Sequence, residues 1–258
     1  MSAHLGELTT EEAKALFAGS PVAVLLPVGS VEPHGPHLPL ETDTIISAAA
    51  CAHAVERLAA RGIVARIAPS IPYGVTDFAA GFAGAVSLSA GAVTAFVGAV
   101  SDALLAAGAA HVCVVNNHLE PAQDAAIRGV LEGRKSGTVS VACPLTRRWA
   151  RTLSAEFKSG ACHAGRYETS LVLAARPDLV NDAARSRLPE VPTSLSEGIK
   201  AGRVTFAAMG MDKAYAGAPA AGTAEEGREQ LALLAQMIEG EVSDGYATLG
   251  YSAAGTRL

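Results

Sequence analysis

The sequence predicts a single α/β domain over residues 1–258, in which a mostly parallel central sheet lies between two layers of helices. Short apolar runs rich in valine alternate along the chain with helix-length segments of helical periodicity, a pattern typical of βαβ units. Polar residues follow directly after two of these runs, as expected at the carboxyl edge of a parallel sheet. No linker, repeat or low-complexity segment marks a second domain.

The first elements are predicted from a capping motif and an apolar run. Thr9 and Glu12 have the spacing of a capping box, so a short helix should begin there and end near Gly19. Residues 21–27, P-V-A-V-L-L-P, are bounded by prolines and predict a buried strand. Residues 44–61 repeat apolar side chains at helical spacing and predict a long helix.

The middle of the chain continues this alternation. Residues 62–69 predict a second strand, and residues 85–89 predict a short third one. Ser89 is placed to cap an alanine-rich helix over 90–107, because its hydroxyl oxygen can accept from a free backbone N–H group. Residues 111–116, H-V-C-V-V-N, predict a strongly apolar strand.

The last part of the chain adds one strand and three helices. Residues 122–134 predict a helix, residues 139–143 a strand, and residues 168–175 a further helix. Thr223 is placed to cap a final helix over 225–242.

Composition argues against several classes of function. The formal net charge is −5 and lysine and arginine do not cluster, which argues against nucleic-acid binding. No apolar run reaches the length of a membrane span, and no secretory signal is visible, so we expect a cytoplasmic protein without a membrane partner. Only 17% of the residues are charged, which favours a homo-oligomer. None of the four cysteines forms a C-x-x-C pair, so buried, reduced thiols are expected.

The most informative stretch follows the first predicted strand. Residues 28–43, V-G-S-V-E-P-H-G-P-H-L-P-L-E-T-D, place Glu32, His34 and Asp43 on a loop stiffened by prolines. Glu32 and His34 are two residues apart and share a face of an extended segment, and the loop can fold Asp43 back towards them. Carboxylate oxygens and imidazole nitrogens are the usual ligands of zinc, manganese and iron. The alternative is a polar surface loop whose histidines are solvated.

A second polar cluster follows the strand predicted at 111–116. His118 and Glu120 repeat the two-residue spacing between imidazole and carboxylate. The carboxyl ends of parallel strands meet at one edge of a sheet, so the two clusters should lie close together. The candidate metal ligands are therefore Glu32, His34, Asp43, His118 and Glu120. The alternative for the second cluster is a turn that caps the next helix.

Two further candidates lie near the helix predicted at 168–175. His163 is expected on a loop, and Glu168 near the N-terminus of the helix. A carboxylate at this position is stabilised by the helix dipole, so a capping role is the alternative for Glu168.

Four motifs, in order along the chain, resemble those of the creatininase (creatinine amidohydrolase) family. The first block runs from Pro27 to Asp43, and N-N-H-L-E contains His118. The third, H-A-G-R-Y-E-T-S, begins at His163, and the fourth, A-P-A-A-G-T-A-E-E-G, ends at Gly227. The resemblance covers nearly the whole domain and implies a creatininase-like three-layer α/β/α fold.

The resemblance implies a site for two divalent metal ions, which would be zinc, manganese or iron. The ligands that it implies for one metal are Glu32, Asp43 and His118. Those for the other metal are His34, Asp43 and Glu120, so that Asp43 would bridge the two ions. It also implies that the protein assembles as a homohexamer.

The resemblance also implies the reaction. A metal-bound hydroxide would cleave a carbon–nitrogen bond in a small cyclic amide, His163 would transfer the proton to the leaving nitrogen, and Glu168 would support His163. Leu119, Pro121 and residues 83–85 depart from the family pattern, so the pocket is expected to differ from that of true creatininases. The alternatives are a peptidase or ring-opening hydrolase with a larger substrate, and a non-catalytic subunit stabilised by metal.

Overall fold

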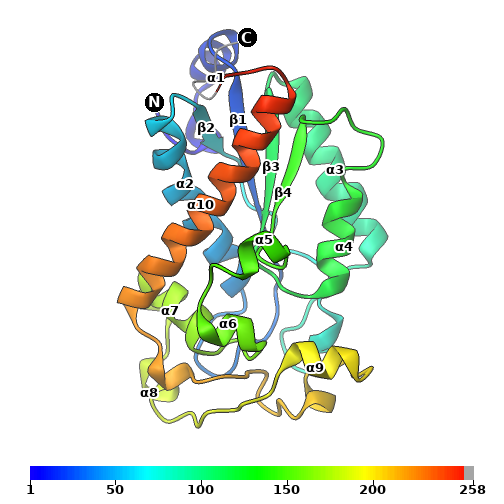
Figure 1. Cartoon of the computed structure of the whole chain (residues 1–258), viewed down its shortest axis with the longest axis vertical. Helices are drawn as coiled ribbons and strands as arrows, with labels where there is room; N and C mark the ends of the chain where they lie inside the picture. Colours follow the sequence, from blue (N-terminus) through cyan, green and yellow to red (C-terminus); the bar gives the residue numbers. More distant parts are fainter. Residues whose placement is uncertain (253–258) are drawn as a thin grey trace.

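The computed structural model describes residues 1–252 and contains a sheet of four parallel strands (Figure 1). The strands are β1 (Val22–Val28), β2 (Val64–Ile67), β3 (His111–Asn116) and β4 (Val139–Ala142), in the spatial order β2-β1-β3-β4. The two central strands, β1 and β3, are buried along their whole length. Their mostly apolar sequences suit this buried position, because helices cover both faces of a parallel sheet.

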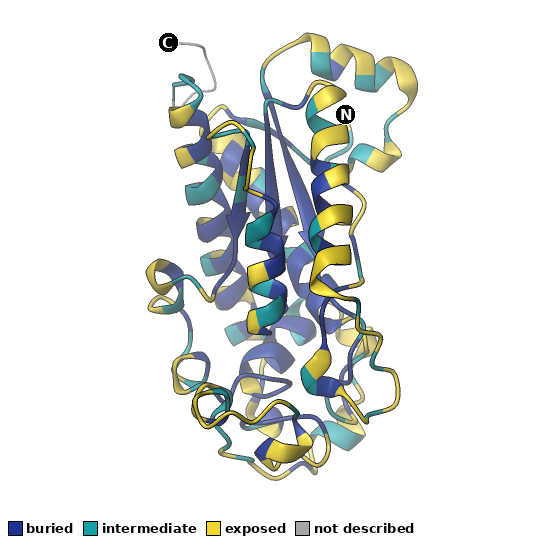
Figure 2. Cartoon of the chain, turned by 90° about the vertical axis from the view of Figure 1, so that its right-hand side faces the viewer, coloured by how far each residue is buried: buried dark blue, intermediate teal, exposed yellow. Residues whose placement is uncertain are grey.

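Helices cover both faces of the sheet, so the fold is the predicted three-layer α/β/α arrangement. On one face lie α2 (Thr42–Ala60) and α10 (Ala224–Thr248), with α7 (Arg166–Ala175) packed against both. On the other face lie α1 (Thr10–Ala18), α3 (Ala90–Ala106) and α4 (Pro121–Gly129). Figure 2 shows the buried strands between helices whose outer sides are exposed.

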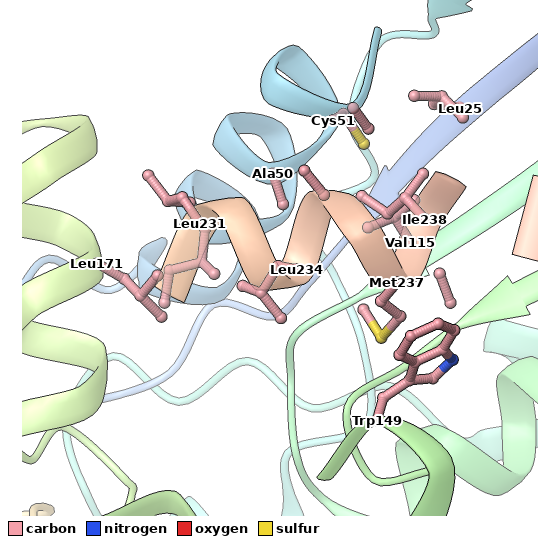
Figure 3. Packing of buried hydrophobic residues seen from close by; sticks show 14 of the residues in the cluster. Leu25, Ala50, Cys51, Val115, Trp149, Leu171, Leu231, Leu234, Met237 and Ile238 are labelled. Carbon is pink, nitrogen blue, oxygen red and sulfur yellow. The ribbon is translucent and has the colours of Figure 1, made fainter. Parts of the chain in front are cut away.

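The two apolar cores follow from the alternation of side chains along the strands. In β1, Ala23 and Leu25 belong to the core beneath α2 and α10, whereas Val22, Val24 and Leu26 belong to the opposite core. In the first core, buried side chains of α10 meet those of α2, α7 and the sheet (Figure 3). The labelled members from α10 are Leu231, Leu234, Met237 and Ile238.

Short helices and loops form the end of the molecule beyond the carboxyl ends of the strands (Figure 1). The α-helical turns there are α5 (Arg147–Ala150), α6 (Ala155–Ser159), α8 (Asp182–Arg185) and α9 (Leu195–Lys200). The 3-10 turns of the chain are η1 (Leu5–Glu7), η2 (Asp77–Ala79), η3 (Pro177–Leu179), η4 (Ala207–Met209) and η5 (Pro219–Ala221). This end holds a third, smaller apolar cluster that includes Phe206 and Met211.

Most predicted elements are confirmed, including the caps. Thr9 and Glu12 form the capping box of α1, and the Ser89 hydroxyl accepts from the N–H of Ala92 at the start of α3. The four cysteines are buried and unpaired, as expected. Helix α2 begins two residues earlier than predicted, at Thr42, so Asp43 lies in its first turn. Among residues 1–252, no helix is both long and apolar enough to cross a membrane.

The strand predicted at residues 85–89 is wrong. The segment makes only an isolated bridge between Gly74 and Ser87, and Val86 is 43% exposed. Its backbone is held instead by single hydrogen bonds, from Val86 to the carbonyl of Val31 and from Leu88 to that of Gly74. The segment therefore lies beside loops, where no strand is available for pairing.

Helices α10 and α7 approach each other so closely that a side chain at residue 227 does not fit unless one helix moves. A Cβ on Gly227 of α10 would overlap the backbone carbonyl of Ser170 in α7. We expect Gly227→Ala to lower the free energy of unfolding by roughly 1–3 kcal/mol, as overpacking does in a rigid interface. Gly91 is a helical glycine of α3 with open space around it, so Gly91→Ala is the matched control and should stabilise by ~0.5–1 kcal/mol. Urea denaturation of both variants measures this, and equal effects would contradict it.

Candidate metal centre

Seven predicted site residues converge on one buried point at the carboxyl edge of the sheet. The loop after β1, the first turn of α2, the loop after β3, and the start of α7 with the loop before it supply their side chains. All seven are at most 6% exposed: Glu32, His34, Asp43, His118, Glu120, His163 and Glu168. The structure thus brings together residues that are up to 136 positions apart, as the prediction from strand ends requires.

Asp43 lies at the centre of this cluster. Its Oδ1 is 3.3 Å from Nε2 of His34, and its Oδ2 is 3.1 Å from Nδ1 of His118. The hydroxyl of Ser30 donates to Oδ2 at 3.2 Å and holds the carboxylate in this orientation. The two oxygens of one carboxylate therefore face two different imidazoles.

The potential ligand atoms of the described residues fall into three groups, of which two share no residue and the third, Glu32, His34 and His163, overlaps both. Glu32, His118 and Glu120 offer one atom each within 4.8 Å of one another, and so do His34, Asp43 and Glu168. Each of these two groups combines carboxylate oxygens with one imidazole nitrogen, a donor set that suits zinc, manganese or iron.

This grouping differs from the one that the resemblance implies. The resemblance places Glu120 with His34 and Asp43, whereas the structure places Glu168 there, with its Oε2 3.5 Å from Nε2 of His34. Glu120 is turned towards η2, where its two oxygens accept from the N–H groups of Asp77 and Phe78 at 3.2 Å each. Glu168 also accepts from a backbone N–H, that of Ala164, at 2.6 Å. This N–H belongs to the loop before α7 and precedes the N-cap residue Gly165, so Glu168 holds that loop and takes part in the cluster without capping the helix.

Backbone carbonyls orient the two imidazoles. The carbonyl of Glu32 lies 3.1 Å from Nδ1 of His34, and that of Val75 lies 2.6 Å from Nε2 of His118. A carbonyl oxygen only accepts, so these nitrogens carry the hydrogen and the lone pairs lie on Nε2 of His34 and Nδ1 of His118. Nε2 of His34 is buried without a hydrogen-bond partner. A buried lone pair that faces carboxylates fits a bound cation.

Sequence reasoning missed a set of supporting residues. Thr76 donates its hydroxyl to Glu32, and Gln123 accepts from the N–H of Val75 at 2.9 Å, which fixes the carbonyl that orients His118. Val75 and Thr76 lie between the segments predicted at 62–69 and 85–89, in a stretch for which the sequence predicts no helix or strand. These two hydrogen bonds join residues more than 40 positions apart, so no local pattern could reveal them.

His163 lies over the cluster. Its ring stacks on Phe206 with centroids 4.2 Å apart, and lies 4.4 Å from the ring of His34. Its Nε2 is 3.0 Å from the carbonyl of Pro33, so Nδ1 carries the lone pair and lies 3.8 Å from Oε1 of Glu32. Its orientation thus turns a free imidazole nitrogen towards the cluster.

The cluster forms one wall of a small, partly enclosed pocket. The rest of the wall is largely apolar and includes the side chains of Phe78, Leu119, Leu195 and Phe206. No lysine or arginine of the described chain lines it. The cavity therefore offers apolar contacts and the buried cluster, but no positive side chain for an anionic group.

The buried charges shift the proton affinities of the cluster. Burial raises the pKa of Glu168 to about 8 and that of Glu120 to about 7. Burial alone would lower the pKa of His34, but the charge of Asp43, followed by those of Glu168 and Glu32, outweighs it and raises the pKa to about 10. Burial, together with the charge of His34, lowers the pKa of His163 to about 4.

A buried cluster of carboxylates and imidazoles beside a pocket, at the carboxyl edge of a parallel sheet, is an arrangement typical of the active sites of α/β enzymes. The family model described as creatinine amidohydrolase matches residues 6–240. The chain therefore belongs to the creatininase family of hydrolases.

Known proteins share this similarity over most of their length. A mycofactocin precursor peptide peptidase from Mycobacterium ulcerans (strain Agy99) is 32% identical over 259 residues, covering 93% of this chain and 90% of the relative. A creatinine amidohydrolase from Pseudomonas putida is 28% identical over 201 residues, covering 70% of this chain and 74% of the relative. A solved structure described as creatininase Mn has a TM-score of 0.66 and 25% identity, and covers 92% of this chain and 96% of its own.

The raised pKa values of Glu168 and His34 predict how the free energy of unfolding depends on pH in protein from which metal has been removed with a chelator. Between pH 6.5 and 8, Glu168 and His34 keep protons that the unfolded chain releases, because their folded pKa values of about 8 and about 10 are raised. The folded state then binds more protons, so stability falls as pH rises, by about 1.4 kcal/mol per pH unit for each such proton.

Melting temperatures from pH 6.5 to 8 measure this effect. We expect them to fall in the metal-free protein, and to fall less steeply in Glu168→Gln, which lacks one titrating group. Added zinc or manganese should flatten the dependence, because a cation takes the place of the protons. A melting temperature that rises with pH in the metal-free protein would contradict the prediction.

Proposed function

We propose that this protein is a metal-dependent hydrolase that cleaves an amide carbon–nitrogen bond with two divalent ions, which are zinc, manganese or iron. The geometry supports one site at Glu32, His118 and Glu120, and a second at His34, Asp43 and Glu168. The observation that carries the proposal is Asp43, whose two oxygens face the histidines of the two groups. A carboxylate placed in this way could bridge the two ions of a two-metal site.

Charge supports the presence of cations. Glu32, Asp43, Glu120 and Glu168 lie within one buried cluster, and ionised carboxylates are very unfavourable in an apolar interior unless they are paired. Two imidazoles can offset only part of this charge. Two divalent ions would neutralise four carboxylates and leave the histidines as neutral ligands.

The residues of the chain would divide the chemistry between them. Bound divalent ions would supply a water of lowered pKa and a positive charge that polarises the substrate carbonyl. His163 can accept a proton at Nδ1 and deliver it to the departing nitrogen, which leaves poorly unless it is protonated. Phe206 stacks on the ring of His163 and keeps it over the site. The alternative that the sequence leaves open for His163 is to orient Glu120 or a water; the carboxylate that its Nδ1 faces, at 3.8 Å, is that of Glu32.

The substrate is proposed from the cavity. A small neutral amide, cyclic in the first candidate, fits the largely apolar lining of the pocket and the absence of lysine and arginine from its described wall. A peptide is the second candidate, because a relative described as a peptidase is 32% identical to this chain over 93% of its length. The apolar side chains of Phe78, Leu119 and Leu195 could hold an apolar residue of such a peptide. A homohexamer in the cytoplasm stays a prediction from the sequence.

The two-metal proposal predicts the metal content of the purified protein. Plasma mass spectrometry should find about two equivalents of zinc, manganese or iron per chain, falling to about one or fewer in His118→Ala. His53 is an exposed histidine on α2, so His53→Ala is the matched control and should keep both equivalents. A wild-type protein that binds none of these ions after reconstitution would refute the proposal.

A substrate panel tests the reaction and the role of His163 together. Lactams, hydantoins, short peptides and lactones are offered to the metal-loaded protein, and hydrolysis of an amide is expected. His163→Ala should keep both metals and lose about 10²- to 10⁴-fold in kcat, the usual contribution of a proton-transferring group. Full turnover in this variant would overturn its role. Hydrolysis of lactones alone would indicate a ring-opening enzyme, and metal without any hydrolysis would indicate a non-catalytic subunit.

A further inference from the structure

Glu156 on α6 takes no part in the metal centre, yet its carboxylate joins separate backbone segments. Its Oε2 accepts from the backbone N–H of Tyr167 at 2.6 Å, and its Oε1 accepts from that of Ala218 at 2.8 Å. A carboxylate that accepts from two backbone N–H groups makes hydrogen bonds about twice as strong as neutral ones. The two donors belong to segments that lie 51 residues apart in sequence.

The first of these segments carries Glu168. Tyr167 lies in the first turn of α7 and directly precedes Glu168, whose Oε2 is 3.5 Å from Nε2 of His34. Glu156 thus fixes the turn from which Glu168 points into the cluster. Its negative charge at the start of this ten-residue helix also interacts favourably with the helix dipole.

The second segment holds His163. The N–H of Ala216 donates to the carbonyl of His163 at 2.8 Å, and Ala218 donates to Glu156 two residues later. Gly217, between them, has a φ of 81°, a conformation that favours glycine, and a Cβ there would overlap Oε1 of Glu156. One carboxylate therefore ties the backbone of His163 to the start of α7.

The loop that carries His163 needs such a restraint. Ala164, between His163 and Gly165, has a φ of 50°, which is uncommon for a residue other than glycine. Such a conformation persists only where the surrounding contacts enforce it. A Cβ on Gly165 would approach Oε2 of Glu156 to 2.7 Å, so the carboxylate packs directly against this loop.

We propose that Glu156 is a positioning residue that holds His163 and Glu168 in register with the metal centre through the N–H groups of Tyr167 and Ala218. The inference rests on the proposed function for its kinetic consequence. The predicted loss of backbone hydrogen bonds, which hydrogen exchange measures, does not depend on any activity.

Solvent access to Glu156 makes a rescue experiment possible. Two surface clefts share Glu156 in their walls, one of them lined also by Thr223 and Glu229 and the other by Pro192 and Ser194. Removal of the side chain in Glu156→Ala would leave a carboxylate-sized space that opens to these clefts. Formate is the smallest carboxylate that could enter it and accept from both N–H groups.

The test compares Glu156→Ala with and without formate, in the full metal-loaded protein. Hydrogen exchange at the amides of Tyr167 and Ala218 should accelerate in the variant. With a substrate from the panel, kcat should fall about 10- to 100-fold, as small displacements of catalytic groups do, while KM changes by less than about threefold. Formate should slow the exchange again and restore kcat. Glu229→Ala removes an exposed carboxylate from the same cleft and should change neither quantity.

Several results would overturn the proposal. If the amides of Tyr167 and Ala218 exchange in Glu156→Ala at the rates of the wild-type protein, the proposal is overturned, whether or not a substrate has been found. Faster exchange with a wild-type kcat would show a purely structural role, and a loss of kcat in a cooperatively folded variant that formate does not restore would exclude positioning.

A second variant covers the case in which Glu156→Ala does not fold. Glu156→Gln keeps the shape of the side chain but retains an acceptor for only one of the two N–H groups. Intermediate exchange and an intermediate kcat are then expected, and wild-type values of both would overturn the proposal. Failure of the wild-type protein to hydrolyse any substrate refutes the proposed function instead, and the exchange measurement still decides the role of Glu156.

Discussion

The repulsion among four buried carboxylates is the constraint on which the rest of this structure depends. Each carboxylate of the cluster has a partner that offsets its charge. Asp43 and Glu168 lie in the first turns of α2 and α7, where the helix dipoles favour negative charge. Glu120 accepts from two backbone N–H groups of η2, and Glu32 accepts from the hydroxyl of Thr76. Such a cluster is stable with cations, or with protons in their place.

The scaffold supplies the rigidity that this arrangement needs. The central strands β1 and β3 are buried throughout and end beside each other, in the pairing of Val28 with Asn116. The loops that carry Glu32 and His118 therefore leave the sheet at neighbouring points. A close-packed core resists displacement of either strand, so the ligand geometry is inherited from the sheet.

The loops beyond the carboxyl ends of the strands determine what reaches the cluster. His163 and Phe206 come from segments with little regular structure, and they are held by contacts with each other and with the carbonyl of Pro33. Such loops vary more readily than the strands beneath them. The two relatives that are 32% and 28% identical to this chain carry the names of different activities, a peptidase and a creatinine amidohydrolase.

The sequence by itself determined the three-layer fold and the set of residues that meet at the carboxyl edge, because strand periodicity and polar residues at strand ends are local signals. It also determined the helix caps at Thr9 and Ser89. Only the tertiary structure decided that Glu168 lies with His34 and Asp43 while Glu120 turns towards η2, because helix packing and backbone N–H groups set those directions. It also decided that residues 85–89 form no strand, since pairing requires a neighbour that no local pattern can supply.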